Sequence, residues 1–187
     1  MKKLLFIAVL AFASVMAYAQ PRAVGGRLGA FNGVSYEHSL GESNMIEIEA
    51  GLSLDGRTDF WQNGYHGRMW GYTVQAAFTY DWIDPFGAKF PEMEKGEWHW
   101  YMGVGAAGGY GWWAYGYGYG YGGAGNWGFL GGAGRVGVEY DFWFPLQLSL
   151  DWRPTLGASL MDNGAGGVMS GLYWEMTSIA LGVRYKF

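Results

Sequence analysis

Few residues in this sequence could carry out covalent or acid–base chemistry. The chain has no cysteine and three histidines, which are His38, His66 and His99. Acyl transfer needs a nucleophile, a base and an orienting acid within hydrogen-bond reach. His66 has Asp59 in the same segment, and Ser159 or Ser170 in a later segment could complete such a triad. No local motif accompanies these residues, so an enzyme is an alternative and not the main prediction.

Cofactor and metal chemistry have no support in the sequence. No cluster of histidine and acidic residues has the spacing of metal ligands, and no phosphate-binding loop appears among the 34 glycines. The formal net charge is −4, which gives no indication of nucleic-acid binding. We therefore expect no cofactor, no metal and no nucleic-acid partner.

The N-terminal segment resembles an export signal. Met1-Lys2-Lys3 is basic, Leu4 to Met16 is almost wholly apolar, and Ala17-Tyr18-Ala19 has the small-x-small pattern of a cleavage site. The apolar run is too short to span a membrane as a helix. We predict a cleaved signal peptide at 1–19 and one folded domain at 20–187, which is a length suited to a single domain.

The composition of the remaining chain is unusual and argues against helices. Glycine supplies 34 of 187 residues and aromatic residues 19%. A glycine in a helix costs about 1 kcal/mol relative to alanine, and disordered chains are poor in aromatic residues. Residues 98–134 lack Lys, Arg, Asp and Glu but are rich in glycine, which does not suit a transmembrane helix. The other structure that can span a membrane is a closed β-barrel.

Eight segments alternate apolar and polar or small residues, as barrel strands do. In the last of them, Ile179, Leu181, Val183, Tyr185 and Phe187 alternate with Ser178, Ala180, Gly182, Arg184 and Lys186. The eight segments lie at 24–31, 34–40, 46–55, 72–82, 98–105, 135–142, 146–153 and 178–187. We predict an all-β fold, an eight-stranded antiparallel transmembrane up-and-down barrel with both termini in the periplasm. A soluble β-sandwich or a soluble lipocalin-like barrel is the alternative.

The connections should alternate between long outer loops and short periplasmic turns. Gly41 to Asn44 and Trp143 to Pro145 fit the short turns, and Asp55 to Arg68, Gly111 to Gly128 and Ser159 to Leu172 fit the long loops. Ile83 to Gly96 is longer than expected for a periplasmic turn, and Asn32-Gly33 is a very tight outer one.

The polar face of the alternation predicts an ion-paired lumen. An interior of eight strands is just wide enough to be filled by side chains, and an unpaired charge there would be costly. Both signs are present in the predicted network, which consists of Arg27, Glu37, Glu47, Glu49, Arg135, Glu139, Asp151, Arg153 and Arg184.

The apolar face predicts two aromatic girdles, since these rings prefer membrane interfaces. The periplasmic girdle would contain Tyr80, Trp82, Trp98, Trp100, Tyr140, Phe142, Tyr185 and Phe187. The outer girdle would contain Trp70, Tyr72, Phe129 and Tyr173 or Trp174. A further aromatic group in the outer loop could bind sugars or a partner, or lie on lipid headgroups: Trp112, Trp113, Tyr115, Tyr117, Tyr119, Tyr121 and Trp127.

Several stretches resemble a known family. The terminal strand ALGVRYKF resembles the segment that the outer-membrane assembly machinery recognises, with Tyr185 and Phe187 as the signal. WHWYMGVGAAGGY (98–110), GRVGVEYDFWFPLQLSLDWRPTLG (134–157) and GVSYEHSL (33–40) resemble the OmpX-like family of small outer-membrane barrels. The resemblance implies an eight-stranded barrel in the outer membrane of a Gram-negative cell, but no single function, because fold does not determine function.

We therefore expect a non-enzymatic, integral outer-membrane protein with a structural or surface-interaction role. Its expected partners are outer-membrane lipids and lipopolysaccharide, the assembly machinery during insertion, and a protein partner in the same membrane. Two alternatives remain open. One is an outer-membrane enzyme that modifies lipid A or phospholipids, and the other is an accessory subunit of a larger outer-membrane complex.

Overall fold

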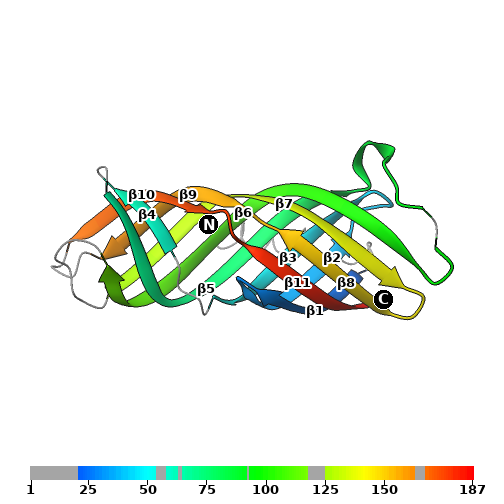
Figure 1. Ribbon diagram of the computed structural model, residues 1–187, viewed down its shortest axis with the longest axis horizontal. Helices are drawn as coiled ribbons and strands as arrows, with labels where there is room; N and C mark the ends of the chain where they lie inside the picture. The colour runs from blue at the N-terminus through cyan, green and yellow to red at the C-terminus, as the bar shows by residue number, and fades with distance from the viewer. Residues whose placement is uncertain (1–20, 54–57, 63–64, 92, 118–124, 163–166) are drawn as a thin grey trace, which may run out of the picture.

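The computed structural model describes residues 21–53, 58–62, 65–91, 93–117, 125–162 and 167–187. They form strands joined by tight connections, with one short 3₁₀ helix (Figure 1). The strands are β1 (Pro21–Gly29), β2 (Asn32–Ser39), β3 (Asn44–Ser53), β4 (Thr58–Gln62), β5 (Tyr65–Ile83), β6 (Gly96–Tyr117), β7 (Gly125–Phe142), β8 (Leu146–Trp152), β9 (Thr155–Asp162), β10 (Val168–Glu175) and β11 (Ile179–Lys186), and the helix is η1 (Pro85–Gly87).

Eight of these strands close into an antiparallel barrel. The ring runs β1-β2-β3-β5-β6-β7-β8-β11, and β11 pairs with β1 to close it. The predicted fold class is confirmed, because all eight alternating segments of the sequence occur as strands of this ring. Both ends of the described chain lie at the same end of the barrel, since Ala23 pairs with Lys186. We call this the terminal end.

The opposite end of the barrel is built from six strands. The hairpin of β1 and β2 turns at Ala30 and Phe31, short of this end. Beyond it, β4, β5, β6, β7, β9 and β10 form a second ring, closed where Leu172 pairs with Trp61 and Tyr173 with Phe60. β4, β9 and β10 continue the walls that β3, β8 and β11 begin. The barrel therefore becomes narrower away from its termini.

The two faces of the wall have opposite chemistry. In β11 the apolar residues Ile179, Leu181, Val183 and Tyr185 are exposed, while Ala180 and Arg184 are buried. The same alternation runs through β7 for its full length. A soluble barrel would bury its apolar face, so this arrangement is inverted and matches a barrel surrounded by lipid.

The three connections expected to be long loops are largely strand. The predicted loop 55–68 contains β4 and the start of β5, 111–128 contains the ends of β6 and β7, and 159–172 contains parts of β9 and β10. Glycine-rich sequence was interpreted as loop, but in this barrel glycine alternates with larger residues along the strands themselves. The tight turn predicted at Asn32-Gly33 lies earlier, at Ala30 and Phe31. Asn32 begins β2, and its side-chain amide exchanges hydrogen bonds with the backbone of Gly29.

The terminal end has short turns at 40–43 and 143–145, as predicted, and the long connection between β5 and β6 that departs from the simple pattern. The described residues include no helix that is both long and apolar enough to cross a membrane.

Candidate functional site

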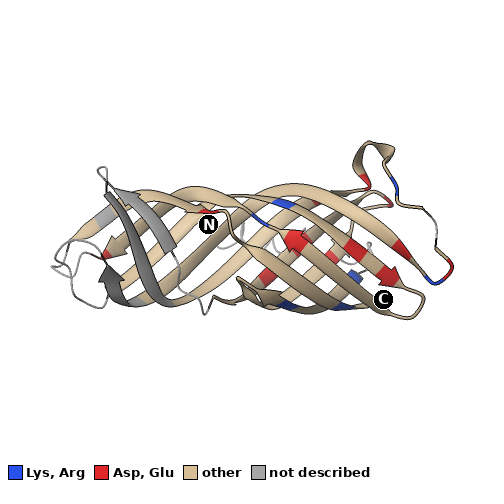
Figure 2. Ribbon diagram, in the orientation of Figure 1, with Lys and Arg blue, Asp and Glu red and all other residues tan. Residues whose placement is uncertain are grey.

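The charged residues of the strands lie mainly in the eight-stranded half of the barrel (Figure 2), and most of their side chains are buried. The alternation of β1, β2, β3, β5, β7, β8 and β11 turns most of them inward, Arg153 follows the end of β8, and all the predicted network residues are buried. The buried charged side chains are Arg27, Glu37, Glu47, Glu49, Asp81, Arg135, Glu139, Asp141, Asp151, Arg153 and Arg184. Carboxylates outnumber guanidinium groups among them, and Arg27, Arg135 and Arg184 each pair with two or more acids.

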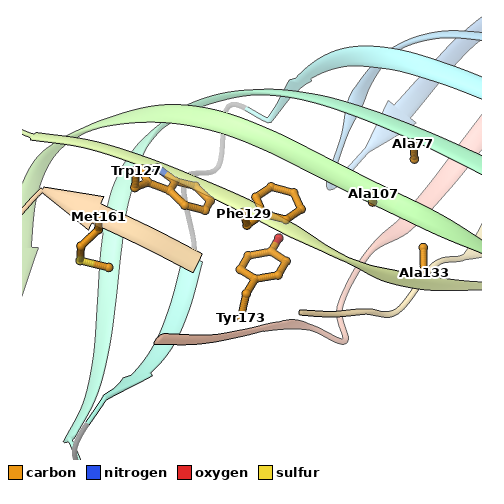
Figure 3. Close-up of a cluster of buried hydrophobic side chains, with 7 residues drawn as sticks. All are labelled: Ala77, Ala107, Trp127, Phe129, Ala133, Met161 and Tyr173. Atoms are coloured by element: carbon orange, nitrogen blue, oxygen red, sulfur yellow. The ribbon is translucent and has the colours of Figure 1, made fainter. Parts of the chain in front are cut away.

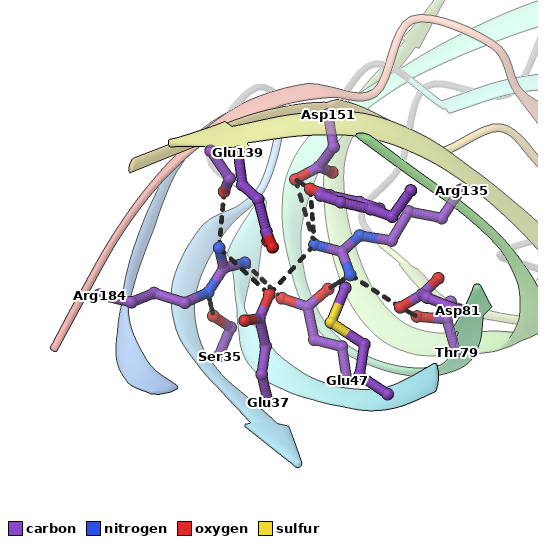
Figure 4. Close-up of polar contacts among 12 residues, drawn as sticks. Ser35, Glu37, Glu47, Thr79, Asp81, Arg135, Glu139, Asp151 and Arg184 are labelled. Atoms are coloured by element: carbon purple, nitrogen blue, oxygen red, sulfur yellow. Dashed lines mark hydrogen bonds and ion pairs between the residues drawn. The ribbon is translucent and has the colours of Figure 1, made fainter. Parts of the chain in front are cut away.

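Arg135 lies at the centre of the network (Figure 4). Its Nη1 is 2.5 Å from a Glu47 oxygen and donates to Asp81 Oδ2 at 2.8 Å. Its Nη2 donates to the Tyr101 hydroxyl at 3.0 Å and lies 3.5 Å from Asp151 Oδ2. One buried guanidinium therefore joins strands β3, β5, β6, β7 and β8 across the lumen.

Arg184 joins the other side of the network. Its guanidinium donates to Ser35 Oγ, Ser149 Oγ and Glu47 Oε1, each at 2.6 Å. Glu47 accepts from both Arg184 and Arg135 and is the link between them (Figure 4). Such shared contacts connect strands that are far apart in the sequence. The charged network therefore forms a single unit, which we call the charged plug of the lumen.

Arg27 and Arg153 extend the network toward the six-stranded half. Arg27 donates to Asp151 Oδ1 at 2.5 Å and pairs with Glu49 at 2.9 Å. Arg153 also pairs with Glu49, and its guanidinium lies over the Phe31 ring at 5.3 Å. Phe31, at the tip of the β1–β2 hairpin, is buried. The Phe31 side chain lies at the boundary of the charged network.

Arg22 belongs to the network although the alternation does not predict it. Its guanidinium donates to Glu37 Oε2 at 3.1 Å and to Glu139, and Asp141 lies 4.0 Å away. The β1–β2 register shifts between Pro21 and Ala23, and a bulge of this kind reverses the side to which a residue points. Simple alternation would place Arg22 on the same outward face as Val24.

Asp81, Asp141, Lys186 and Tyr101 are further members that the predicted network omitted. They lie on the polar side of the alternating segments, so the alternation indicates that their side chains point inward. Their partners come from other strands, which the alternation does not identify. Lys186 Nζ donates to Asp141 Oδ2 at 2.6 Å. Near this pair, Gln147 donates to Glu139 at 3.1 Å.

Glycines on the inner face make room for these large side chains. A Cβ atom at Gly137 would lie 2.5 Å from the Tyr101 hydroxyl and 2.6 Å from its ring. One at Gly109 would lie 2.6 Å from the Phe129 ring. At these inner-face positions of β6 and β7 the absence of a side chain thus follows from the volume of the side chains in a narrow lumen.

Tyr101 offers a test of the network that leaves its charges intact. Its hydroxyl accepts from Arg135 and donates to Asp151 at 3.2 Å, and the side chain is fully buried. Tyr101→Phe should lower the free energy of unfolding by about 1–3 kcal/mol, because both partners lose a hydrogen bond in a buried site. Urea titration of the folded barrel in lipid vesicles measures this loss. Tyr185→Phe, on an exposed side chain of the outer face, is the control and should change little.

The six-stranded half of the lumen is filled by an aromatic stack (Figure 3). Phe129 and Tyr173 stack with ring centroids 4.0 Å apart, and Trp127 stacks on Phe129 at 5.6 Å. Met161 and three alanines, Ala77, Ala107 and Ala133, belong to the same buried cluster. The lumen therefore contains an apolar plug in its six-stranded half and the charged plug in its eight-stranded half.

This stack corrects two predictions and decides a third. Trp127, predicted in the surface group, is 3% exposed, and Phe129, predicted in the outer girdle, is buried. The outer girdle was predicted to contain Tyr173 or Trp174; Tyr173 is buried in the lumen, whereas its neighbour Trp174 is half-buried. The reason is that the alternation of β7 continues unbroken from Arg135 back to Trp127, so Phe129 and Trp127 share the inner face of Arg135.

Other aromatic predictions have different outcomes. Trp112 is 51% exposed, and Tyr72, in the expected outer girdle, is also exposed. The structure does not describe the other predicted aromatic positions: the side chains of Trp70, Trp113, Tyr115 and Tyr117, and the whole of Tyr119 and Tyr121. At the terminal end, aromatic side chains on the outer face contact one another in pairs, with ring centroids 4.6–5.2 Å apart. The pairs are Tyr80–Trp82, Trp98–Tyr140, Tyr140–Phe142 and Tyr185–Phe187. We call these side chains, with Trp100, the terminal belt.

The candidate triad of Asp59, His66 and Ser159 or Ser170 lies only partly among the described side chains, where Ser170 is exposed. Ser159 is buried and its hydroxyl donates to the Gly171 carbonyl at 3.4 Å, while the side chains of Asp59 and His66 lie outside the described residues. His38 contacts the Tyr36 hydroxyl at 2.9 Å, and His99 contacts Asp84 at 2.7 Å at the terminal end. Across the described residues, no group of three or more His, Asp or Glu could hold a metal ion.

Comparison with known proteins locates the fold. No protein-family model matches the chain, and no curated protein does. Among solved structures, the chain is similar to the crystal structure of a major outer membrane protein from Thermus thermophilus. The two share 14% identity and a TM-score of 0.50, over 91% of this chain and all of that one. The likeness shows the fold alone: an eight-stranded antiparallel barrel of the kind found in an outer-membrane protein.

Proposed function

We propose that the protein spans the outer membrane as a plugged barrel and has a structural or surface-interaction role, without enzymatic or channel activity. The observation that carries this proposal is the pairing of an apolar outer face with a lumen filled at two levels, by the charged network and by the aromatic stack. Residues 1–19, the proposed signal peptide, lie outside the described residues. The likeness to an outer-membrane protein supports the location, and the OmpX-like motifs support the family.

The dimensions of the outer face fit this proposal. Tyr72 and Trp82 both lie on the outer face of β5, one toward each end of the barrel. At about 3.4 Å per residue and a strand tilt of about 40°, the stretch between them spans roughly 25 Å along the barrel axis. This is the height of the apolar band in transmembrane barrels.

The filled lumen predicts that the protein does not conduct ions. We expect the purified, folded barrel to give no reproducible current steps in planar bilayers at high salt, because two layers of buried side chains separate its ends. A known porin added to the same bilayer serves as the positive control. Stable open-channel currents from this protein would contradict the plugged-barrel function.

The C-terminal strand predicts recognition by the outer-membrane assembly machinery. Tyr185 and Phe187 are exposed on the outer face, where such a signal can be read. Deleting Phe187 should sharply reduce the amount of folded, heat-modifiable barrel in the outer membrane without changing export to the periplasm. The control is Lys186→Arg, which keeps the length of the chain and its terminal Phe187. An unchanged yield of folded barrel after the deletion would show that Phe187 is not part of the signal.

For the catalytic alternative, Ser159 faces the lumen and is buried, Ser170 is exposed, and the side chains of Asp59 and His66 lie outside the described residues. A surface-interaction role has more support, since Tyr72, Tyr110 and Trp112 are exposed near the narrow end. Tyr110 and Trp112 contact each other edge to face at 5.5 Å. They could rest on lipopolysaccharide headgroups or contact a protein in the same membrane.

A further inference from the structure

The connection between β5 and β6 is the distinctive feature of the terminal end. It begins at Asp84, contains η1 and returns to the barrel at Gly96. In Figure 1 the part around η1 projects sideways from the wall, off the barrel axis, before the chain returns to β6. A segment that extends sideways at this level lies over the surface of the surrounding membrane, whereas a segment that extends along the axis would enter the aqueous space. We call residues 84–91 and 93–95 the side loop.

The first part of the side loop, residues 84–88, is bonded to β6. The Asp84 carboxylate accepts from the Trp100 backbone N–H at 3.2 Å and contacts His99 Nδ1 at 2.7 Å. The Trp100 indole donates to the Ala88 carbonyl at 2.6 Å. Asp84 and Phe86 have φ angles of 45° and 62°. Non-glycine residues persist in this region only where their surroundings require it, and such strain is concentrated at functional positions.

The side loop presents apolar side chains where a solvated turn would present polar ones. Phe86 is 91% exposed, and Phe90 and Met93 are exposed as well. The Phe90 ring lies 6.2 Å from Trp98, a member of the terminal belt. The apolar surface of the loop is therefore continuous with the belt that the proposed function places at the membrane interface.

A hollow lies between the side loop and the outer wall of the barrel. Trp82 and Met102 line it from the wall, Phe86 lines it from the loop, and Glu42, Ser43 and Lys89 are at its polar side. Ile83 N donates to the Ser43 carbonyl at 2.8 Å, which fixes the β2–β3 turn beside the loop. The hollow thus combines outward-facing apolar side chains with one exposed ammonium group, that of Lys89, and with the carboxylates of Glu42 and Asp84.

We propose that this hollow holds one phospholipid of the membrane leaflet at the terminal end. The start of its acyl chains would lie against Trp82 and Met102 beneath Phe86, and Lys89 would pair with its phosphate. An acidic peptide or free phosphate would use Lys89 but leave the apolar side uncovered, so the combination favours a lipid. The proposal rests on the proposed function, because it requires this end of the barrel to lie at a membrane interface.

Lipid retention tests the hollow directly. The folded barrel, purified in mild detergent with phosphatidylethanolamine as the probe, should retain one tightly bound phospholipid in native mass spectrometry. Lys89→Ala should weaken retention about five- to tenfold, the effect of removing one charge–phosphate contact of about 1 kcal/mol or slightly more. Lys95→Ala is the matched control, because Lys95 is an exposed lysine of the same loop that does not line the hollow. Equal retention by wild type, K89A and K95A, or no retained lipid in any of them, would overturn the proposal.

A second measurement separates this proposal from the proposed function. The chain has no cysteine, so single variants F86C, E94C and L150C can each carry one environment-sensitive fluorophore in vesicles containing spin-labelled lipids. Leu150 is exposed on the outer face of β8 and reports insertion. We expect quenching by deep labels at L150C, by headgroup-level labels at F86C, and little quenching at E94C. Quenching at L150C with none at F86C would overturn the lipid site alone. No quenching at L150C would overturn the membrane location and the lipid site with it.

Discussion

Replacing Arg135 with methionine should lower the free energy of unfolding of the barrel by about 3–5 kcal/mol. Methionine is unbranched and uncharged, so it removes the charge while keeping a flexible chain in the same space. Glu47, Asp81 and Asp151 would lose the guanidinium that lies 2.5–3.5 Å from each of them. Removing one partner from a buried ion pair leaves an uncompensated charge, which is far more costly than removing the whole pair. Urea titration in lipid vesicles, followed by tryptophan fluorescence and by heat-modifiability on gels, measures the loss.

A double variant identifies the cause of that loss. Among the described residues, the only positive group paired with Asp81 is Arg135. Asp81→Asn should therefore recover part of the stability in the R135M background, although in the wild-type background it should be destabilising. The coupling between the two changes should be about 1–3 kcal/mol. Lys95→Met, on an exposed loop residue, is the control and should stay within about 0.5 kcal/mol of wild type. An unfolding midpoint for R135M equal to that of wild type would show that the network does not stabilise the fold.

Replacing Val104 with arginine should destabilise the inserted barrel by about 2–4 kcal/mol. Val104 is 58% exposed on the outer face of β6. It lies between Trp98 and Trp100 toward the terminal end and Tyr110 and Trp112 toward the narrow end, so its side chain should face the middle of the apolar band. Unfolding titrations in vesicles give the magnitude, and the yield of folded protein gives an independent readout.

Two controls show whether depth in a membrane is the cause. Val104→Leu keeps the site apolar and should be nearly neutral. Leu40→Arg places the same charge on an exposed residue beside the β2–β3 turn, at the interface, where the penalty falls to about 0–1 kcal/mol. If V104R were as stable as wild type, or L40R equally damaging, the outer face would not be in contact with acyl chains.

Much of the wall could be predicted from the sequence because side-chain direction in a strand is a local property. Successive residues point to opposite faces whatever the partner strand is. The pairs Leu181 and Arg184, or Val136 and Arg135, were therefore assigned to the correct faces without knowledge of any contact. The same rule, applied further along β7, would have placed Phe129 and Trp127 inside. The predictions for these two residues were wrong because aromatic side chains also favour membrane interfaces and surface loops, and that preference was given more weight than the direction set by the strand.

The extent of the strands was less predictable because glycine has two meanings. In most proteins a glycine-rich segment indicates a turn. In β6 and β7 glycines such as Gly109 and Gly137 occupy the inner face, where any side chain would collide with Phe129 or Tyr101. That requirement depends on residues of other strands, so the local pattern alone could not distinguish a long strand from a loop.

The sequence by itself therefore determined an eight-strand count, an apolar outer face and a charged lumen, because all three follow from the period-two geometry of each strand. Only the tertiary structure decided how the strands meet: the six-stranded ring closed by β4 and β10, the bulge that turns Arg22 inward, and the sharing of Glu47 between Arg135 and Arg184. These features depend on the register between strands that are distant in the chain. Register is set by the combined packing of all side chains in the closed lumen, and no single segment contains that information.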